Sequence, residues 1–315
     1  PEHVIDTLVF SRGEVTKTYT SLEPRLAINY MLGYNRSLKL SYNRVRQFLF
    51  MLSNTIAVSP TDQWKLCDYH VIPPYVDQIS AGYYEDVPGA GLSTSFELYY
   101  KWISGLVEYR DGANFISSPY VEQLTLPGEQ RAYGLEAMVK KSGGKLNGWI
   151  SYSYARSLMQ VKSSVPGEEI NQGSPYPSNY DRPHSLNLVT NFKVNRRLSC
   201  SANMVYSSGR PVTYPVSIYY MEGIQYVDYS SRNSYRIPDY FRLDFSINLE
   251  GNLKERKWFH SYWMLNFYNL TGRENAYSVY FKNEDGAIQG NKISIFARPI
   301  ITLSWNFKLG NYASE

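Results

Sequence analysis

Long stretches of the chain alternate between apolar and polar residues, most clearly in the last third. Segment 242–249 reads RLDFSINL and segment 301–307 reads ITLSWNF. Since side chains of a strand point alternately to its two faces, each segment predicts a strand with one apolar and one polar face. The pattern persists over roughly 8–10 residues, the length of a tilted strand that crosses a bilayer. The polar face carries Arg242 and Asp244, which a packed core would not accept unpaired. We therefore expect an apolar outside and a wet interior.

The connections between the expected strands alternate between short and long. The short ones are turns near 33–35, 87–91, 142–144, 194–196 and 251–254. The long ones are polar segments near 49–74, 110–130, 159–182, 208–236 and 271–292. Bacterial outer-membrane barrels have short periplasmic turns and long extracellular loops. A β-sandwich would have short turns at both ends. The sequence thus predicts an all-β fold, an antiparallel transmembrane outer-membrane β-barrel.

The strand count indicates an incomplete barrel. About 11 strands are expected, ending with one at 293–309, whereas single-chain bacterial barrels have an even number. The chain would then be half of a 22-stranded barrel, the size of plugged outer-membrane transporters. Residues 1–315 are interpreted as one C-terminal part of that barrel, with the first strands lying outside this chain. The sequence opens at Pro1 without a signal peptide, which is typical of a mature fragment.

Composition agrees with a barrel and excludes other classes. The chain has 30 tyrosines and 16% aromatic residues, and tyrosine suits a membrane interface. No window approaches 18 consecutive apolar residues, which excludes a transmembrane helix. The formal charge is only +4 and is dispersed, so we expect no nucleic-acid partner. Cys67 and Cys200 are far apart, and the four histidines form no close-spaced set. The sequence therefore predicts no disulfide, metal site or cofactor.

Several segments, in order, resemble a known family. They are SLEPRLAINYMLGYNRSLKLSYNRVRQFLFMLSN, PPYVDQISAGYYED, RAYGLEAMVKKSGGKLNGWISYSYARS, YDRPHSLNL, SSGRPVTYP, YRIPDYFRLDFSINL and NFYNLTGRENAYSVYF. Together they resemble the C-terminal β-barrel of TonB-dependent outer-membrane receptors of the Bacteroidetes type. The resemblance implies a place in the Gram-negative cell outer membrane. It also implies TonB-dependent import of a scarce or large ligand: a siderophore, cobalamin-like cofactor, oligosaccharide or peptide.

The same resemblance implies partners. An N-terminal plug with a TonB box, neither visible in this sequence, would connect the barrel to the TonB complex. Outer-membrane lipid would surround the wall, and a surface lipoprotein is a further candidate partner over the extracellular loops. Two other classes stay open: a passive porin or structural scaffold barrel partnered with such a lipoprotein, and an outer-membrane hydrolase using His184. Import involves no covalent chemistry by the barrel, so we expect no enzyme.

Candidate site residues fall into two sets. Binding groups concentrate on loops held by a rigid scaffold, and aromatic rings stack on sugars and flat ligands. The loop and upper-lumen candidates are Trp64, Tyr69, Tyr120, Tyr176, Tyr180, Tyr214, Tyr219, Tyr220 and Tyr226. Charges expected on the lumen face are Arg25, Lys39, Glu97, Lys101, Glu136, Lys140, Arg242 and Asp244. These charges either select the ligand or pair with one another and solvate the wall. We expect no catalytic residues.

Overall fold

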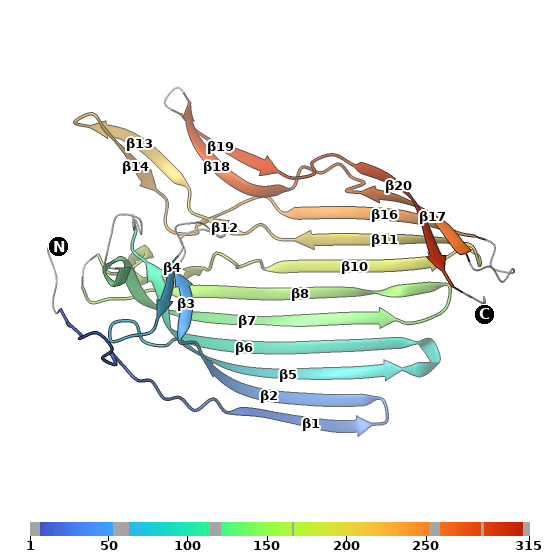
Figure 1. Cartoon of the computed structure of the whole chain (residues 1–315), viewed down its shortest axis with the longest axis horizontal. Helices are drawn as coiled ribbons and strands as arrows, with labels where there is room; N and C mark the ends of the chain where they lie inside the picture. Colours follow the sequence, from blue (N-terminus) through green and yellow to red (C-terminus); the bar gives the residue numbers. More distant parts are fainter. Residues whose placement is uncertain are drawn as a thin grey trace.

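One antiparallel sheet dominates the computed structural model, which describes residues 7–52, 63–111, 113, 121–165, 167–251, 259–284 and 287–310. Its long strands follow one another in chain order, each paired with the next (Figure 1). They are β1 (Arg25–Gly33), β2 (Arg36–Arg46), β5 (Tyr75–Val87), β6 (Leu92–Tyr109), β7 (Thr125–Lys141), β8 (Leu146–Gln160), β10 (His184–Lys193), β11 (Leu198–Ser207), β16 (Tyr240–Glu250), β17 (Phe259–Tyr268) and β20 (Ile300–Leu309). The predicted all-β fold of about 11 antiparallel strands is confirmed.

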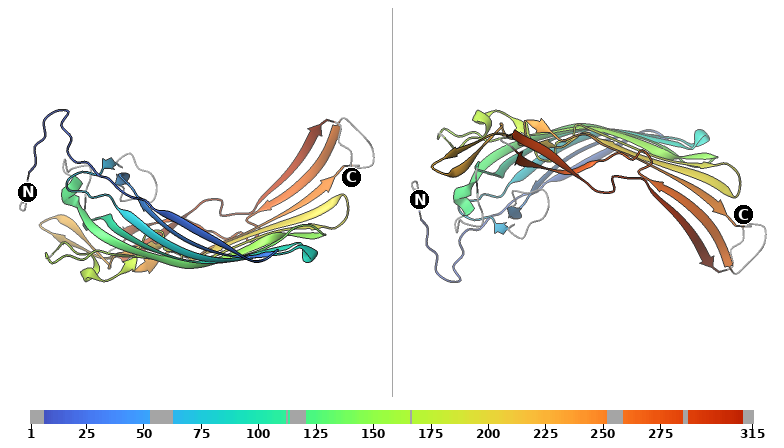
Figure 2. Two further views of the ribbon diagram at one scale, coloured as in Figure 1. Left: turned by 90° about the horizontal axis from the view of Figure 1, so that it is seen from below. Right: turned by 90° about the horizontal axis from the view of Figure 1, so that it is seen from above.

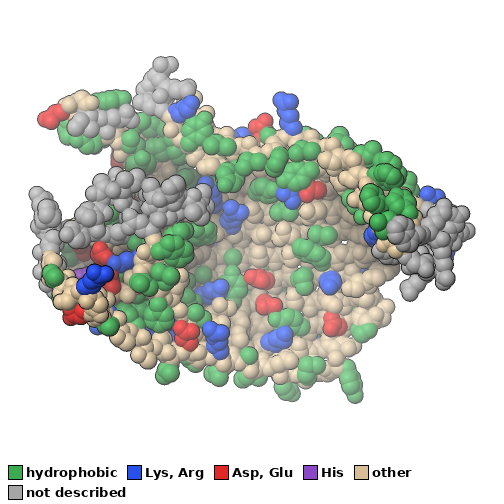
Figure 3. All heavy atoms as spheres, in the orientation of Figure 1, with side chains coloured by type: hydrophobic (Ala, Val, Ile, Leu, Met, Phe, Trp, Pro, Cys, Tyr) green, Lys and Arg blue, Asp and Glu red, His purple; other side chains and the backbone are tan. Residues whose placement is uncertain are grey.

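The sheet is curved like a trough (Figure 2). Its two faces differ in polarity. The ladder registers align Leu40, Ala81, Leu98 and Leu135 in one row across β2, β5, β6 and β7. The neighbouring row, on the opposite face, contains Lys39, Gly82, Glu97 and Glu136. Figure 3 shows the hollowed face, where charged side chains are scattered among polar ones. The apolar rows therefore lie on the outer face.

The outer face carries large apolar side chains that are left exposed in the part of the chain that the structure describes. Leu26, Ile28, Ile301 and Leu303 are each more than 60% exposed. Burying such a side chain is worth about 1.5–3 kcal/mol, so a continuous band of them favours a lipid environment over water. The described residues contain no helix that is long and apolar enough to cross a membrane.

Both sheet ends match the predicted alternation of connections. At one end lie the short turns after β1, β5, β7 and β10, including the 3-10 turn η1 (Pro88–Ala90). The long connections gather at the other end (Figure 1). Leu309, the last residue of β20, lies at the short-turn end. The loop end is therefore where a ligand-binding surface is expected.

The long connections contain structure that the sequence interpretation missed. Three of them include hairpins, namely β3 (Leu49–Leu52) with β4 (Gln63–Leu66), β13 (Pro215–Met221) with β14 (Ile224–Tyr229), and β18 (Ala276–Glu284) with β19 (Ala287–Ser294). Short pieces complete them: β9 (Tyr176–Pro177), β12 (Pro211–Val212), β15 (Tyr235–Arg236), η2 (Val121–Leu124) and η3 (Asn171–Gly173).

Two strand boundaries differ from the prediction. The last strand begins at Ile300, and not at 293, because residues 287–294 pair with β18. Phe296 has a positive φ of 53°, and Pro299 has no N–H for a ladder, so the chain cannot continue as one strand. β7 begins at Thr125 inside the predicted polar segment 110–130, and it pairs with β6 up to Tyr109.

Candidate functional site

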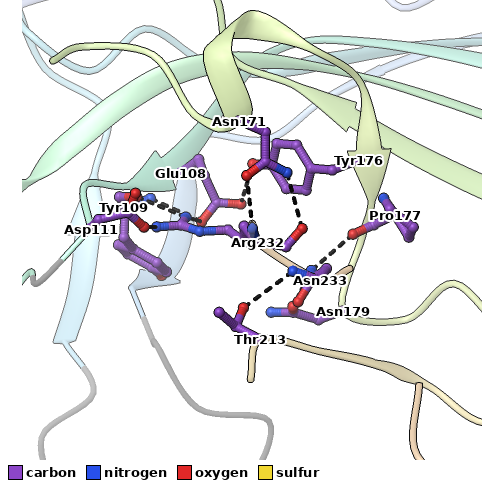
Figure 4. Close-up of polar contacts among 10 residues, drawn as sticks. All are labelled: Glu108, Tyr109, Asp111, Asn171, Tyr176, Pro177, Asn179, Thr213, Arg232 and Asn233. Atoms are coloured by element: carbon purple, nitrogen blue, oxygen red, sulfur yellow. Dashed lines mark hydrogen bonds and ion pairs between the residues drawn. The ribbon is translucent and has the colours of Figure 1, made fainter. Parts of the chain in front are cut away.

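Arg232 connects three chain segments at the loop end of the sheet (Figure 4). Its Nη1 donates to Oε1 of Glu108 at 3.0 Å and to the carbonyl of Tyr109 at 2.8 Å, and its Nη2 pairs with Asp111. Asn171 accepts from the Arg232 backbone N–H at 2.7 Å and donates to its carbonyl at 3.0 Å. Burial lowers the pKa of Arg232, but Glu108 and Asp111 outweigh it and hold the pKa above its ordinary value. The end of β6 is thereby fixed to loops 161–183 and 208–239.

Asn233 makes a second set of contacts from the same loop. Its side-chain amide donates to the carbonyl of Pro177 and to Oδ1 of Asn179, both at 2.8 Å. Its φ is 57°, a left-handed conformation that asparagine adopts more readily than most residues. This buried side chain therefore positions loop 208–239 against loop 161–183.

Asp181 is the most buried charge of the loop end. Its side chain is 0% exposed and lies between Arg156 and Arg236. The backbone N–H of Ser157 donates to its Oδ1 at 2.6 Å. Arg236 also donates to the carbonyl of Gly209 at 2.9 Å. A buried carboxylate requires such partners, so this cluster ties both loops to β8.

Beside these contacts lies a cavity of about 800 Å³. It is lined by Asn179, Arg182, Arg210, Pro211, Val212, Thr213, Asn233, Tyr240, Arg242, Tyr268, Asn269, Asn275, Ala276, Tyr277, Ser278, Val279, Ile295 and Phe296. No aspartate or glutamate is among these lining residues. The strand residues that line it belong to β12, to the start of β18 and to the loop ends of β16 and β17. The cavity is thus cationic and lies at the loop end of the sheet.

Arg242 is held firmly at the base of the cavity. Its Nε donates to Oδ2 of Asp244 at 3.0 Å, and its Nη1 donates to the hydroxyls of Tyr240 and Tyr268 at 3.2 and 3.0 Å. Its guanidinium also lies 4.7 Å from the ring centroid of Tyr268. The backbone N–H of Asn269 donates to Oδ1 of Asp244 at 2.9 Å. The positive charge of Arg242 is therefore already balanced by the carboxylate of Asp244.

Arg182 and Arg210 differ from Arg242 in having no such partner. Neither side chain forms a hydrogen bond or ion pair with any residue in the described ranges, although the backbone carbonyl of Arg210 accepts from the N–H of Ile237 at 3.1 Å. Arg182 is exposed and Arg210 is half-buried. Burial, together with the nearby charge of Arg182, lowers the pKa of Arg210. The two guanidiniums therefore repel each other across the cavity wall.

Comparison with known proteins identifies the family of this chain. The family model described as "TonB dependent receptor-like, beta-barrel" matches residues 6–270. The chain belongs to this TonB-dependent receptor family. Its members are outer-membrane receptors, so the predicted family and outer-membrane location are confirmed, and the family consists of transporters. No curated protein sequence matches the chain.

Solved structures of TonB-dependent receptors share the fold at low sequence identity. The ferric-catecholate import receptor Fiu from E. coli is 15% identical with a TM-score of 0.54, over 90% of this chain and 34% of its own. The ferripyoverdine receptor of Pseudomonas aeruginosa is 13% identical with a TM-score of 0.52, over 90% of this chain and 32% of its own. The chain thus spans about a third of the length of these structures.

The predicted loop candidates are distributed over several places in the receptor. Trp64 and Tyr69, on the connection between β2 and β5, are 70% and 55% exposed, and Tyr180, on the connection between β8 and β10, is 75% exposed. Tyr219 stacks on Tyr226 with ring centroids 5.5 Å apart on hairpin β13–β14, which also carries the exposed Tyr220. Tyr214 packs 5.0 Å from Phe281 of β18. Tyr120 lies outside the described residues. None of the described candidates lines the cavity.

Tyr176 has a structural environment. Its ring is 2% exposed in a small core with Leu126, Val161 and Ile170. Its hydroxyl donates to Oε2 of Glu108 at 3.3 Å, and burial followed by that carboxylate raises the pKa of the hydroxyl. This position favours a role in loop packing over direct contact with a ligand.

The registers place all the predicted lumen charges on the polar face. Several have partners there. Lys39 lies 4.3 Å from the ring centroid of Tyr84, whose hydroxyl donates to Glu97 at 2.7 Å. Lys101 lies 5.1 Å from the ring centroid of Tyr99. Arg25 is 3.8 Å from Glu23. Glu136 stands opposite Glu97, and Lys140 stands opposite Ser93.

The cavity residues that sequence reasoning missed include Arg182 and Arg210. Each directly precedes a proline, in Arg182-Pro183 and Arg210-Pro211. The first lies just before β10 and the second just after β11, and these two strands are antiparallel neighbours. Two such Arg-Pro pairs at the same end of one hairpin are a signal that sequence reasoning can use. The extended conformation favoured before proline places both side chains at the loop bases.

Proposed function

We propose that this chain forms the C-terminal wall of a 22-stranded barrel that imports a scarce or large ligand across the outer membrane. The observation that carries the proposal is the cavity at the loop end, whose base is formed by Arg242, Tyr240 and Tyr268. It lies where an extracellular ligand would first meet the barrel. The braced loops around it hold that site in a defined shape, which lowers the entropic cost of binding.

The proposed ligands are a siderophore, a cobalamin-like cofactor, an oligosaccharide or a peptide. Capture occurs at the extracellular loops and upper lumen. A plug outside this chain then rearranges under force from the TonB complex. The neighbours in fold are described as an import receptor and as a receptor bound to ferripyoverdine, which supports a role in uptake. A surface lipoprotein over the loops remains part of the proposal as a possible partner.

A hydrolase is disfavoured by the surroundings of His184. Its Nδ1 lies 2.9 Å from the hydroxyl of Tyr152, and its ring packs 5.4 Å from that of Tyr154. The Oγ of Ser208 accepts a hydrogen bond from the His184 backbone at 3.1 Å. These contacts are those of a histidine at a loop–strand junction and do not activate a serine nucleophile.

Growth experiments test the import proposal. A strain that lacks the full-length receptor is grown on single limiting sources of iron, cobalamin, glycan or peptide, beside a strain that lacks TonB. Import predicts that one source fails to support growth in both strains and that a plasmid copy of the receptor restores growth only when TonB is present. Uptake that survives loss of TonB and accepts many small solutes would instead identify a passive porin.

A further inference from the structure

The cavity contains two cations that no described residue of the chain neutralises. Elsewhere at the loop end, arginines are matched by carboxylates: Arg156 and Arg236 by Asp181, and Arg232 by Glu108. Arg182 and Arg210 have no such acid among the residues that the structure describes. A half-buried charge such as that of Arg210 is normally paired in proteins. Arg210 therefore departs from this rule, and the exposed Arg182 adds a second positive charge near it.

Two aspartates of the same loops, Asp181 and Asp239, already have other partners. Asp181 is shared by Arg156 and Arg236. Asp239 accepts from the hydroxyl of Tyr206 at 2.7 Å and from the backbone N–H of Gly209 at 2.9 Å. Since these carboxylates are held by fixed donors, neither is free to turn toward Arg182 and Arg210. The positive charge of Arg182 and Arg210 is therefore not balanced by either of these two aspartates.

The rest of the wall defines what else an occupant would meet. Val212, Val279, Ile295 and Phe296 supply apolar surface, and Tyr277 is a further aromatic residue of the lining. A guanidinium presents several N–H donors in a planar fork that matches a carboxylate or phosphate. The wall is therefore complementary to an apolar or aromatic body that bears an anionic group.

We propose that Arg182 and Arg210 together bind an anionic group, a carboxylate, phosphate or other oxyanion, of the imported ligand, whose apolar part contacts Val279 and Phe296. The inference rests on the proposed import function and narrows its ligand class. Neutral oligosaccharides are excluded as ligands of this cavity. An anion between the two arginines removes their mutual repulsion and supplies the missing partner to both.

The test uses the purified full-length receptor and two matched probes. 4-Iodobenzoate has a carboxylate on an aromatic ring, and 4-iodobenzyl alcohol is its uncharged counterpart. Binding is measured in detergent solution by ligand-observed NMR, and the site is located by the anomalous signal of iodine in crystals. The variant is Arg182→Gln with Arg210→Gln. The control is Lys145→Gln with Arg196→Gln, which removes the same charge from exposed turns at the opposite end.

We expect the acid to bind with its carboxylate between Arg182 and Arg210, and the alcohol to bind at least tenfold more weakly. The double variant weakens binding of the acid by about tenfold or more, as for loss of charge-assisted hydrogen bonds, and the control does not change it. Each protein must keep the heat-dependent gel mobility of a folded barrel. Should the double variant fail to fold, Arg210→Gln alone and the wild-type crystals still decide the result.

Equal binding of the two probes, or unchanged binding by the variant, would overturn the inference. So would a full-length structure in which a carboxylate of the receptor itself pairs with both arginines. The import proposal fails separately, because it depends on TonB-dependent growth, whereas binding to purified receptor needs no TonB. If the receptor binds 4-iodobenzoate at this site but transports no ligand, the anion-binding proposal holds and the import proposal is refuted.

Discussion

The guanidinium of Arg232 lies 3.0 Å from the carboxylate of Glu108, although the two residues are 124 positions apart in the sequence. This pair brings loop 208–239 onto the end of β6, with β7, β8, β10 and β11 between them in the sheet. The side chains are only 16% and 13% exposed, so the interaction is removed from solvent screening. The loop end of the barrel is therefore one braced structure and not a set of independent loops.

Replacing Arg232 by methionine should release that brace. The change keeps the length of the side chain but leaves the carboxylate of Glu108 without its cation, and breaking a buried pair costs about 3–5 kcal/mol. We expect the barrel to remain folded and loop 208–239 to become sensitive to proteolysis. Limited trypsin or chymotrypsin digestion of the full-length receptor, followed by mass spectrometry, measures the effect.

The matched control is Arg110→Met, which breaks the more exposed pair with Glu168. Exposed pairs contribute about 0–1 kcal/mol, so its digestion rate should stay close to wild type. Adding Glu108→Gln to Arg232→Met should recover part of the protection, because the only carboxylate then left without Arg232 is that of Asp111, which is 79% exposed. Equal digestion of the Arg232 and Arg110 variants would contradict the proposed brace.

Gly209 should not tolerate even alanine. A Cβ at this position would lie 1.7 Å from the carbonyl oxygen of Ile237, and backbone atoms there are held by the hydrogen bond from Arg236. Gly209→Ala must therefore push apart the two arms of loop 208–239 at their base. We expect a lower yield of folded receptor and weaker binding in the adjoining cavity, measured by heat-dependent gel mobility and by 4-iodobenzoate binding.

Gly89→Ala is the control for that substitution, since a Cβ at Gly89 would have no atom within 4 Å. Surface substitutions of this kind usually change stability by about 0.5 kcal/mol or less. The folded yield of Gly89→Ala should equal that of the wild type. Wild-type behaviour of Gly209→Ala would mean that the loop base moves freely, against the packing described here.

Strand content and face assignment could be predicted from sequence because they depend on local alternation. Apolar residues at every second position of one strand, such as Leu243, Phe245 and Ile247 of β16, have the same period as the pleat. The pattern therefore defines the strands and their two faces. Hairpin β13–β14 was also open to prediction, since Glu222-Gly223 between alternating residues is a turn signal. It was missed because the segment was interpreted only as a polar loop.

The candidate site could not be predicted in the same way, because its contacts are long-range. Nothing near Arg232 in the sequence indicates Glu108, and nothing near Asp181 indicates Arg236. Aromatic residues were favoured as ligand contacts by type alone, and that argument does not distinguish an exposed ring such as Tyr180 from the buried ring of Tyr176. Placement in the loops depends on pairings that only the folded sheet creates.

Acid should loosen loop 208–239 through Asp239. The Tyr206 hydroxyl and then the Gly209 N–H hold the pKa of this carboxyl below its ordinary value of 3.8, aided by the charges of Arg273 and His184. The pKa of Asp239 is lower in the folded protein than in the unfolded chain. The carboxylate therefore stabilises the fold at pH values above the unfolded-state pKa, and this stabilisation is lost as the pH falls through the folded-state pKa. Digestion by pepsin, measured relative to an unfolded substrate at the same pH, should therefore accelerate as pH falls from about 5 to below the ordinary value of 3.8.

Asp239→Asn should remove that dependence and leave the loop partly loosened at every pH in this range. Asp228→Asn makes the same charge change at an exposed position of β14, which has no hydrogen bond to its side chain among the described residues. It should keep the wild-type response to acid. If the digestion of Asp239→Asn depends on pH as that of the wild type does, then a group other than Asp239 causes the acid sensitivity.

The two edges of the sheet lead to a final prediction. Among the described strands, β1 and β20 each have only one neighbour, so one side of each strand presents unpaired N–H and C=O groups. Lipid cannot satisfy these groups, which is why membrane-spanning sheets close into barrels. Residues 1–315 expressed alone should therefore form no closed pore. In planar bilayers we expect no discrete conductance steps, and on gels no heat-dependent shift, whereas the full-length receptor should shift. A stable dimer of the isolated chain that joins β1 of one copy to β20 of the other, and conducts in discrete steps, would contradict the need for further strands.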